Sequence, residues 1–228
     1  MVVFAPHPDD ETLGCGGTIL KRIAEGYEVF IVVMTDGRHA LSKMCGLTDL
    51  NPEKMKRIRR SEMLRAMAIL GVPSQNVFFW DFEDGLLANC TTAAKVKVLK
   101  LLNELNPSEV YYPYEKDYHC DHRAAGVILQ DCIPKLNYFP ETYRYLIEHK
   151  FARFGPLVAR ILKLFRQDIF SVDITEFLDK KASAIAQFES QIKVVCDEQD
   201  HPVVEKVKNH LEKNERFYLT SFRKKSGD

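Results

Sequence analysis

The sequence has no long hydrophobic run and no net charge. No apolar stretch approaches the roughly 20 residues that a membrane-spanning helix requires. We expect no signal peptide, because residues of chemical interest begin by position 7. Lysine and arginine together number 32, as do aspartate and glutamate. This balance gives no reason to expect a nucleic-acid partner.

Cysteines are few and scattered. No two of the six have the spacing of a zinc knuckle, which argues against a structural zinc site. A chain of 228 residues can form a core that is stable without disulfides. We therefore expect reduced thiols and a cytoplasmic location.

The composition is that of an ordinary globular enzyme. Hydrophobic residues make up 46% of the chain and charged residues 28%, enough to build a core and to cover it. No repeat, low-complexity tract or linker-like shift divides the sequence. We expect a single domain over residues 1–228.

Strand-like apolar segments alternate with helical patterns. A helix is expected after Asn51, which can cap it, with Pro52 in its first turn and Gly71 at its end. A second is expected from Thr91 or Thr92 to Leu105. Strands are predicted over residues 2–5, 29–35, 77–80, 110–113 and 169–172. The alternation predicts a Rossmann-like α/β fold, in which helices flank a mostly parallel sheet.

One histidine and three carboxylates follow the first predicted strand, in the segment Ala5-Pro6-His7-Pro8-Asp9-Asp10-Glu11. In an open α/β sheet, the carboxyl ends of strands are where ligands bind. The two prolines keep the residues before them extended, so that His7 and Asp10 can point to one place. The segment therefore predicts two metal ligands and a spare base.

A second group of titratable residues follows the strand predicted at 110–113. It includes His119, Asp121 and His122, and His122 can supply a third ligand. Two imidazoles and a carboxylate, with the fourth position left to water, are typical of catalytic zinc. Such a set also suits iron, cobalt or manganese. For any one of these residues alone, a surface turn or a helix cap would be the simpler explanation.

The glycines Gly14, Gly16 and Gly17 lack the spacing of a dinucleotide-binding fingerprint, and an acidic cluster precedes them. We expect them instead to let the first helix approach the sheet.

With both segments in view, the sequence resembles the LmbE-like or PIG-L family of zinc-dependent de-N-acetylases. The family hallmarks, Ala-His/Pro-His-Pro-Asp-Asp-Glu and a later Asp-x-His-x-Asp-His, are both present. The likeness continues through residues 35–37, 59–72, 84–87, 172–175 and 181–191. The resemblance implies an LmbE-like fold and one Zn²⁺ per chain, held by His7, Asp10 and His122.

The resemblance also implies catalytic roles for three further residues. Asp9 would deprotonate a water molecule bound by the metal, which then attacks the amide carbonyl. His119, when protonated, would stabilise the oxyanion, and Asp121 would favour the imidazolium form of His119 and fix its tautomer. The simpler alternatives are that Asp9 caps the first helix and that Asp121 caps the helix predicted at 123–132.

Arg59 and Asp84 match family positions near the sugar pocket, where a guanidinium and a carboxylate can bind ring hydroxyls. A sufficient alternative for Arg59 is a helical ion pair with Glu62. Residues 143–170 match nothing in the family pattern. Within them, residues 150–166 combine basic and large apolar side chains. That stretch could contact a lipid-linked substrate or a membrane surface, although packing on its own domain or on another subunit is commoner.

The sequence therefore predicts a hydrolase that removes an acetyl group from an N-acetylated amino sugar, an N-acetylglucosamine-type conjugate. Family resemblance also suggests a homo-oligomer, a trimer or a hexamer. Two alternatives stay open. One is a non-catalytic, metal-dependent sugar-binding protein, and the other is a metal hydrolase that acts on another amide or ester.

Overall fold

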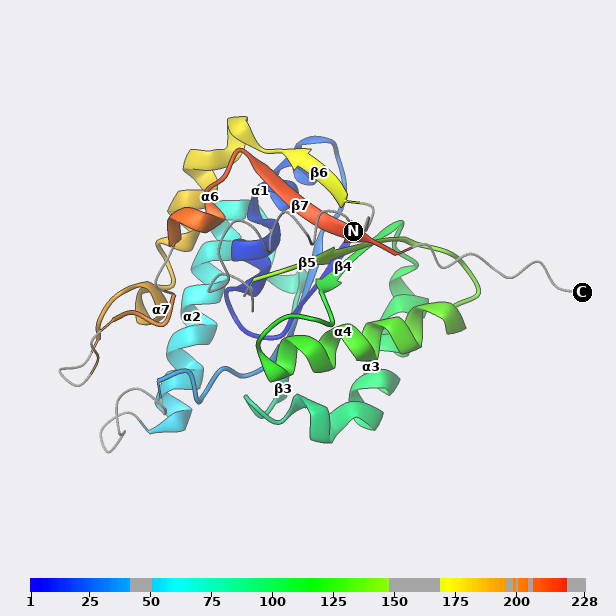
Figure 1. Cartoon of the computed structure of the whole chain (residues 1–228), viewed down its shortest axis with the longest axis horizontal. Helices are drawn as coiled ribbons and strands as arrows, with labels where there is room; N and C mark the ends of the chain where they lie inside the picture. Colours follow the sequence, from blue (N-terminus) through cyan, green and yellow to red (C-terminus); the bar gives the residue numbers. More distant parts are fainter. Residues whose placement is uncertain (42–50, 148–168, 196–198, 200, 205–206, 221–228) are drawn as a thin grey trace, which may run out of the picture.

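A seven-stranded sheet organises the chain in the computed structural model (Figure 1). The structure describes residues 1–41, 51–147, 169–195, 199, 201–204 and 207–220. The strand order is β3-β2-β1-β4-β5-β7-β6. Strands β1 to β5 pair in parallel, and β7 pairs antiparallel with β5 and β6. The strands are β1 (Val2–Ala5), β2 (Phe30–Thr35), β3 (Val77–Phe82), β4 (Glu109–Pro113), β5 (Glu141–Tyr145), β6 (Ile169–Asp173) and β7 (Asn214–Leu219). The predicted fold class is confirmed.

Helices cover both faces of the sheet (Figure 1). They are α1 (Asp10–Ala24), α2 (Pro52–Leu70), α3 (Thr91–Leu105), α4 (Cys120–Cys132), α6 (Leu178–Ile185) and α7 (Glu189–Ile192). Short 3₁₀ helices lie at Ser74–Asn76, Leu87–Cys90, Ile133–Lys135, Thr175–Phe177 and Val207–His210. Side chains alternate along β1: Val3 packs with α1 and α2 residues, whereas Val2 and Phe4 pack with α3 and α4 residues. The sheet thus separates two hydrophobic cores.

The ends of helix α2 form as the sequence predicts. The Asn51 side chain accepts a hydrogen bond from the backbone N–H of Glu53, and Pro52 begins the helix. Gly71 ends it in the left-handed conformation, with φ 85°. The inward side of the helix buries Met63 and Met67 in the core on that face of the sheet.

The glycines of α1 allow close packing, as predicted. A Cβ on Gly14 would lie 2.7 Å from the ring of Tyr145 in β5, and one on Gly17 would lie 2.5 Å from Ile174. Both distances are shorter than real Cβ contacts. Bare backbone at these positions therefore lets α1 lie close to the sheet and to the segment after β6.

Strands β5 and β7 are absent from the sequence prediction. Their sequences, Glu-Thr-Tyr-Arg-Tyr and Asn-Glu-Arg-Phe-Tyr-Leu, carry too many polar residues for an apolar-run signal. Several of those polar side chains are nevertheless buried, because distant groups pair with them. Arg144 contacts Glu115 and the backbone oxygen of Leu219, and Glu215 contacts Lys181. Tertiary contacts, not local pattern, stabilise these two strands.

The segment at 150–166, predicted to contact lipid or another surface, lies outside the described residues. Among the residues that the structure describes, no helix is both long enough and apolar enough to span a bilayer.

Candidate active site

The two motif segments meet at one edge of the sheet. Residues 6–9 follow β1 and residues 114–119 follow β4, and these strands are neighbours that run parallel. The helix after β1 packs on one face of the sheet and the helix after β4 on the other. This is the topological switch point at which open α/β sheets bind ligands.

Three predicted metal ligands converge there. His7 Nδ1 lies 3.2 Å from Asp10 Oδ2 and 3.3 Å from His122 Nε2, and His122 Nε2 lies 3.1 Å from Asp10 Oδ2. Donor atoms at ~2.0–2.1 Å from a tetrahedral zinc ion would lie about 3.3 Å apart. All three residues are buried. The triangle of donors therefore fits a small divalent cation.

Carboxylates hold the outer nitrogens of both imidazoles. His7 Nε2 lies 3.2 Å from Asp84 Oδ1 and 3.2 Å from Asp121 Oδ2, and His122 Nδ1 lies 3.2 Å from Asp117 Oδ1. Such partners fix the ring orientation and raise the basicity of metal-ligating histidines. The inner nitrogens, His7 Nδ1 and His122 Nε2, therefore face Asp10 and each other.

The charge balance of this cluster favours a cation. Burial alone would lower the pKa of His122, but Asp10 and Asp117 raise it to about 10. The pKa of His7 is raised as well, since Asp10, Asp121 and Asp84 outweigh its burial. Clustered carboxylates therefore hold positive charge on the rings, and a bound metal ion would take the place of those protons.

Asp9 lies beside the donor triangle in a strained backbone conformation. Its φ is 142°, a region that non-glycine residues rarely occupy. The backbone N–H of Asp9 donates to Glu11 Oε2 at 3.2 Å. Burial raises the pKa of Asp9 to about 7, against the lowering effect of Arg59. Asp9 precedes α1 at the capping position, but its side chain makes no capping hydrogen bond.

His119 precedes α4, and its ring lies against the imidazoles of His7 and His122. The ring centroid is 4.6 Å from that of His7 and 5.1 Å from that of His122. His119 Nδ1 accepts the backbone N–H of Asp121 at 3.2 Å, so His119 is the helix cap. The predicted cap at Asp121 is wrong, because the helix begins at Cys120 and Asp121 lies within its first turn.

The carboxylate of Asp121 contacts different groups from those expected. Besides His7, it accepts the backbone N–H of Gly85 at 2.7 Å and that of Leu87 at 3.1 Å. The Asp121 side chain contacts His7 directly, and its charge also acts to raise the pKa of His119, as predicted, but burial and the neighbouring imidazoles outweigh that effect. Burial lowers the pKa of His119 to about 4, and the charges of His7 and His122 add to this effect.

The two predicted sugar-binding residues have protein partners. Arg59 is 3% exposed, and its Nη2 contacts Asp9 Oδ2 at 3.0 Å and the carbonyl oxygen of Pro8 at 2.8 Å. Asp84 holds His7 and accepts the backbone N–H of His39. The alternative pair between Arg59 and Glu62 is wrong, since Glu62 accepts hydrogen bonds from Ser190.

Sequence reasoning left Asp117 without a role, yet it is fully buried in the site. Besides His122, it accepts the backbone N–H of His119 at 3.1 Å and that of Ile147 at 3.0 Å. Its place as the first aspartate of the Asp-x-His-x-Asp-His segment was the available signal. Position in the motif gave no indication of which histidine it would contact.

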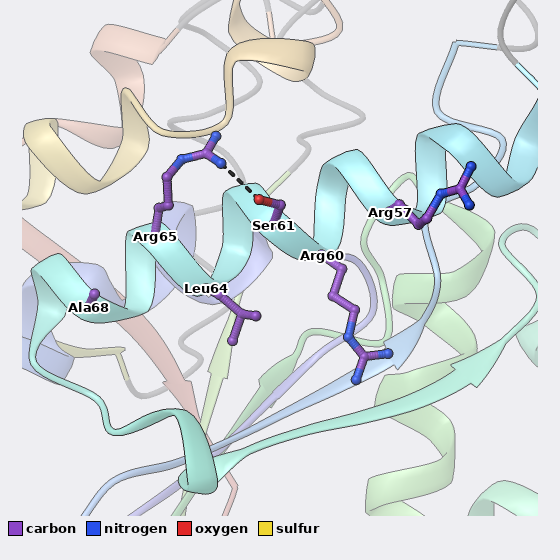
Figure 2. A pocket seen from close by; sticks show the side chains of 6 residues that line it. All are labelled: Arg57, Arg60, Ser61, Leu64, Arg65 and Ala68. Carbon is purple, nitrogen blue, oxygen red and sulfur yellow. Dashed lines mark hydrogen bonds between the residues drawn. The ribbon is translucent and has the colours of Figure 1, made fainter.

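A separate hollow lies on the outward side of α2 (Figure 2). None of the predicted site residues lines it. In it, Arg65 donates a hydrogen bond to Ser61 at 2.9 Å. The lining residues are Arg57, Arg60, Ser61, Leu64, Arg65 and Ala68. Arg59 belongs to the same helix but faces inward to Asp9, so it does not share the solvated surface of its neighbours.

The chain is an α/β protein with a group of histidines and aspartates, at the switch point of its sheet, that could hold a metal ion. The family described as PIG-L, GlcNAc-PI de-N-acetylase, matches residues 2–133. The chain belongs to this family of deacetylases.

Individual relatives extend the likeness along the chain. The diacetylchitobiose deacetylase of Thermococcus kodakarensis is 27% identical over 200 residues, which cover 84% of this chain and 69% of that protein. A probable N-acetyl-alpha-D-glucosaminyl L-malate deacetylase 2 of Bacillus anthracis is 28% identical over 241 residues, covering 99% and 96%. The structure of N,N'-diacetylchitobiose deacetylase from Pyrococcus horikoshii matches with a TM-score of 0.72 at 24% identity, covering 96% and 82%. That likeness shows the fold.

Proposed function

We propose that this protein is a metal-dependent hydrolase that removes the acetyl group from an N-acetylated amino sugar, a conjugate of the N-acetylglucosamine type. The observation that carries the proposal is the triangle of His7, Asp10 and His122 donors beside Asp9 and His119. A binding site alone would need neither of the last two residues.

Zinc is the proposed metal, one ion per chain, with His7, Asp10 and His122 as its protein ligands. Two imidazoles and one carboxylate leave a position open for exchange, as in hydrolytic zinc sites. When bound, the metal would polarise a water molecule and the amide carbonyl. Asp84, Asp117 and Asp121 support the site by holding the outer nitrogens of the two rings.

Asp9 is the proposed general base. Arg59 holds one of its carboxylate oxygens, and the N–H of Asp9 is tied to Glu11, so the group is fixed beside the ligands. A carboxylate that is ionised near neutral pH can take the proton of the attacking water as the carbon–oxygen bond forms. The same proton can then be passed to the nitrogen of the leaving amine.

His119 is the proposed donor to the carbonyl oxygen as negative charge develops there. Its Nδ1 accepts a backbone N–H, so the proton of the neutral ring belongs on Nε2. A fixed donor of this kind is worth ~10²–10³ in kcat at other oxyanion sites. In this scheme the Asp121 carboxylate orients His7, and the backbone N–H of Asp121 donates to His119 Nδ1.

The substrate class follows from the family and the relatives. The family description names a de-N-acetylase of a glucosamine conjugate, and both relatives are named for substrates that contain N-acetylglucosamine-type units. Arg59 and Asp84 as contacts for sugar hydroxyls stay predictions, and those contacts would require both side chains to exchange their present partners.

The direct test measures release of acetate and primary amine by zinc-loaded protein from a panel of N-acetylated sugars and glycoconjugates. Asp9→Asn and His119→Ala are the matched variants. We expect turnover to fall by ~10²–10⁴ in Asp9→Asn, with zinc content and sugar binding retained. Turnover near the wild-type value in Asp9→Asn would refute the proposed base. Sugar binding without turnover in the wild type would favour the non-catalytic alternative, and turnover confined to other amides or esters would favour a different hydrolase.

A further inference from the structure

Cys120 lies between His119 and Asp121 in the segment that follows β4. Its side chain is exposed at the first residue of α4. The sulfur lies 4.0 Å from Asp121 Oδ1. One ligand atom each from His119, Cys120 and Asp121 lies within 4.8 Å of the other two. The chain thus places a nitrogen, a sulfur and an oxygen donor close together beside the candidate active site.

We propose that His119, Cys120 and Asp121 form a second metal site, which takes zinc or another thiophilic divalent ion and inhibits the enzyme. A thiolate selects soft metals, and imidazole and carboxylate complete a set that zinc accepts. Zinc–sulfur and zinc–oxygen bonds of ~2.3 and ~2.1 Å at a tetrahedral angle bring sulfur and oxygen to about 3.6 Å. The observed 4.0 Å between sulfur and oxygen requires a shift of a few tenths of an ångström, and the His119 nitrogen, within 4.8 Å of both, must also move toward them.

The two sites differ in access to solvent. His7, Asp10 and His122 are all buried, whereas in the second set Cys120 is exposed, His119 is half-buried and Asp121 is buried. Free metal can therefore reach Cys120 and His119 from solvent after the inner triangle is filled, with Asp121 as the buried third donor. The Cys120 thiol gives up its proton to solvent when the metal–sulfur bond forms.

Inhibition follows from the residues that the second site uses, and this step rests on the proposed function. A metal on His119 occupies the ring that would otherwise serve the carbonyl oxygen. A metal on Asp121 competes for the carboxylate that orients His7 through the 3.2 Å contact at Nε2. The enzyme should then work best with one equivalent of zinc and lose turnover when zinc is in excess.

The test uses full-length protein loaded with one equivalent of zinc and titrated with Cd²⁺, whose thiolate complexes absorb in the ultraviolet. Wild type should gain one equivalent of thiolate-bound cadmium, and Cys120→Ala should gain none. Cys90→Ala, which removes a partly exposed cysteine elsewhere, is the matched control and should behave as wild type. With a substrate, the zinc concentration for half-inhibition should rise at least ~10-fold in Cys120→Ala, with turnover at one equivalent unchanged.

The outcomes separate the two proposals. An unchanged cadmium absorption in Cys120→Ala, or its loss in Cys90→Ala, overturns the second site. Equal inhibition of wild type and Cys120→Ala by excess zinc overturns it as well, and leaves the deacetylase proposal intact. A Cys120-dependent cadmium site in a protein that turns over no N-acetylated compound supports the second site, and counts against the proposed function alone.

Discussion

Arg59 Nη2 lies 3.0 Å from Asp9 Oδ2, and both residues are buried. The same guanidinium donates to the carbonyl oxygen of Pro8. A Cβ atom on Gly37 would lie 2.6 Å from Nη1 of Arg59. The arginine thus packs between the loop after β1 and the loop after β2, and supports the strained backbone of Asp9.

We expect Arg59→Met to lower kcat by ~10–100-fold, because misplacing a catalytic group costs this much even when the chemistry is intact. Arg59→Lys should restore part of the loss, since a single ammonium can reach Asp9 but cannot also hold Pro8. Zinc content and steady-state kinetics on the best substrate are the measurements. A change confined to KM would instead favour the predicted sugar-binding role of Arg59.

Removing the Asp117 carboxylate, which contacts Nδ1 of His122, should weaken metal binding. Asp117→Asn loses the negative charge at 3.2 Å from His122 Nδ1, and changes at such outer partners typically cost 10–100-fold in affinity. Competition with a chelator of known affinity measures this directly. Asp131→Asn, an exposed position on α4 paired with Lys95, is the control. Equal affinity in Asp117→Asn and wild type would contradict the assignment.

The buried pair Lys181–Glu215 joins α6 to β7 at 2.7 Å. Glu215 also accepts the backbone N–H groups of Gly17 and Thr18, which ties β7 to α1. Lys181→Met should cost ~3–5 kcal/mol of unfolding free energy, because it leaves a buried carboxylate without its counter-charge. Lys95→Met, which breaks the exposed pair with Asp131, should cost less than ~1 kcal/mol. Urea unfolding of both variants tests the contrast, and equal losses would refute it.

His210 should make stability depend on pH below neutrality. Burial lowers its pKa to about 4, with the charge of Lys181 adding to the effect, whereas an unfolded histidine titrates near ~6.5. Between these values the unfolded chain binds more protons, so stability is complete above pH ~6.5 and falls as the pH falls toward 4. The loss from pH 7 to pH 5 is about 1–2 kcal/mol.

His210→Gln should remove that share of the pH dependence, and His201→Gln, at an exposed position, should not. Urea unfolding at pH 7 and pH 5 gives the comparison. The same pH dependence in wild type and His210→Gln would show that folding does not lower the pKa of His210.

Local pattern was enough to predict the framework of the site. The apolar run 2–5 leads to His7, and the run 110–113 leads to His119 and His122. Parallel strands bring such ends to one edge of a sheet. The residue types then limited the chemistry, because imidazoles and a carboxylate are metal donors wherever they converge.

Tertiary structure alone determined the contacts around that framework. The Asp121 carboxylate contacts His7 directly, Asp117 contacts His122, and Arg59 supports Asp9. Strands β5 and β7 form because Arg144 and Glu215 find partners far along the chain. These contacts depend on which buried charged side chains meet in the folded chain. A buried charge is stable only beside a partner, and the distance between two residues along the sequence does not show which partners will meet.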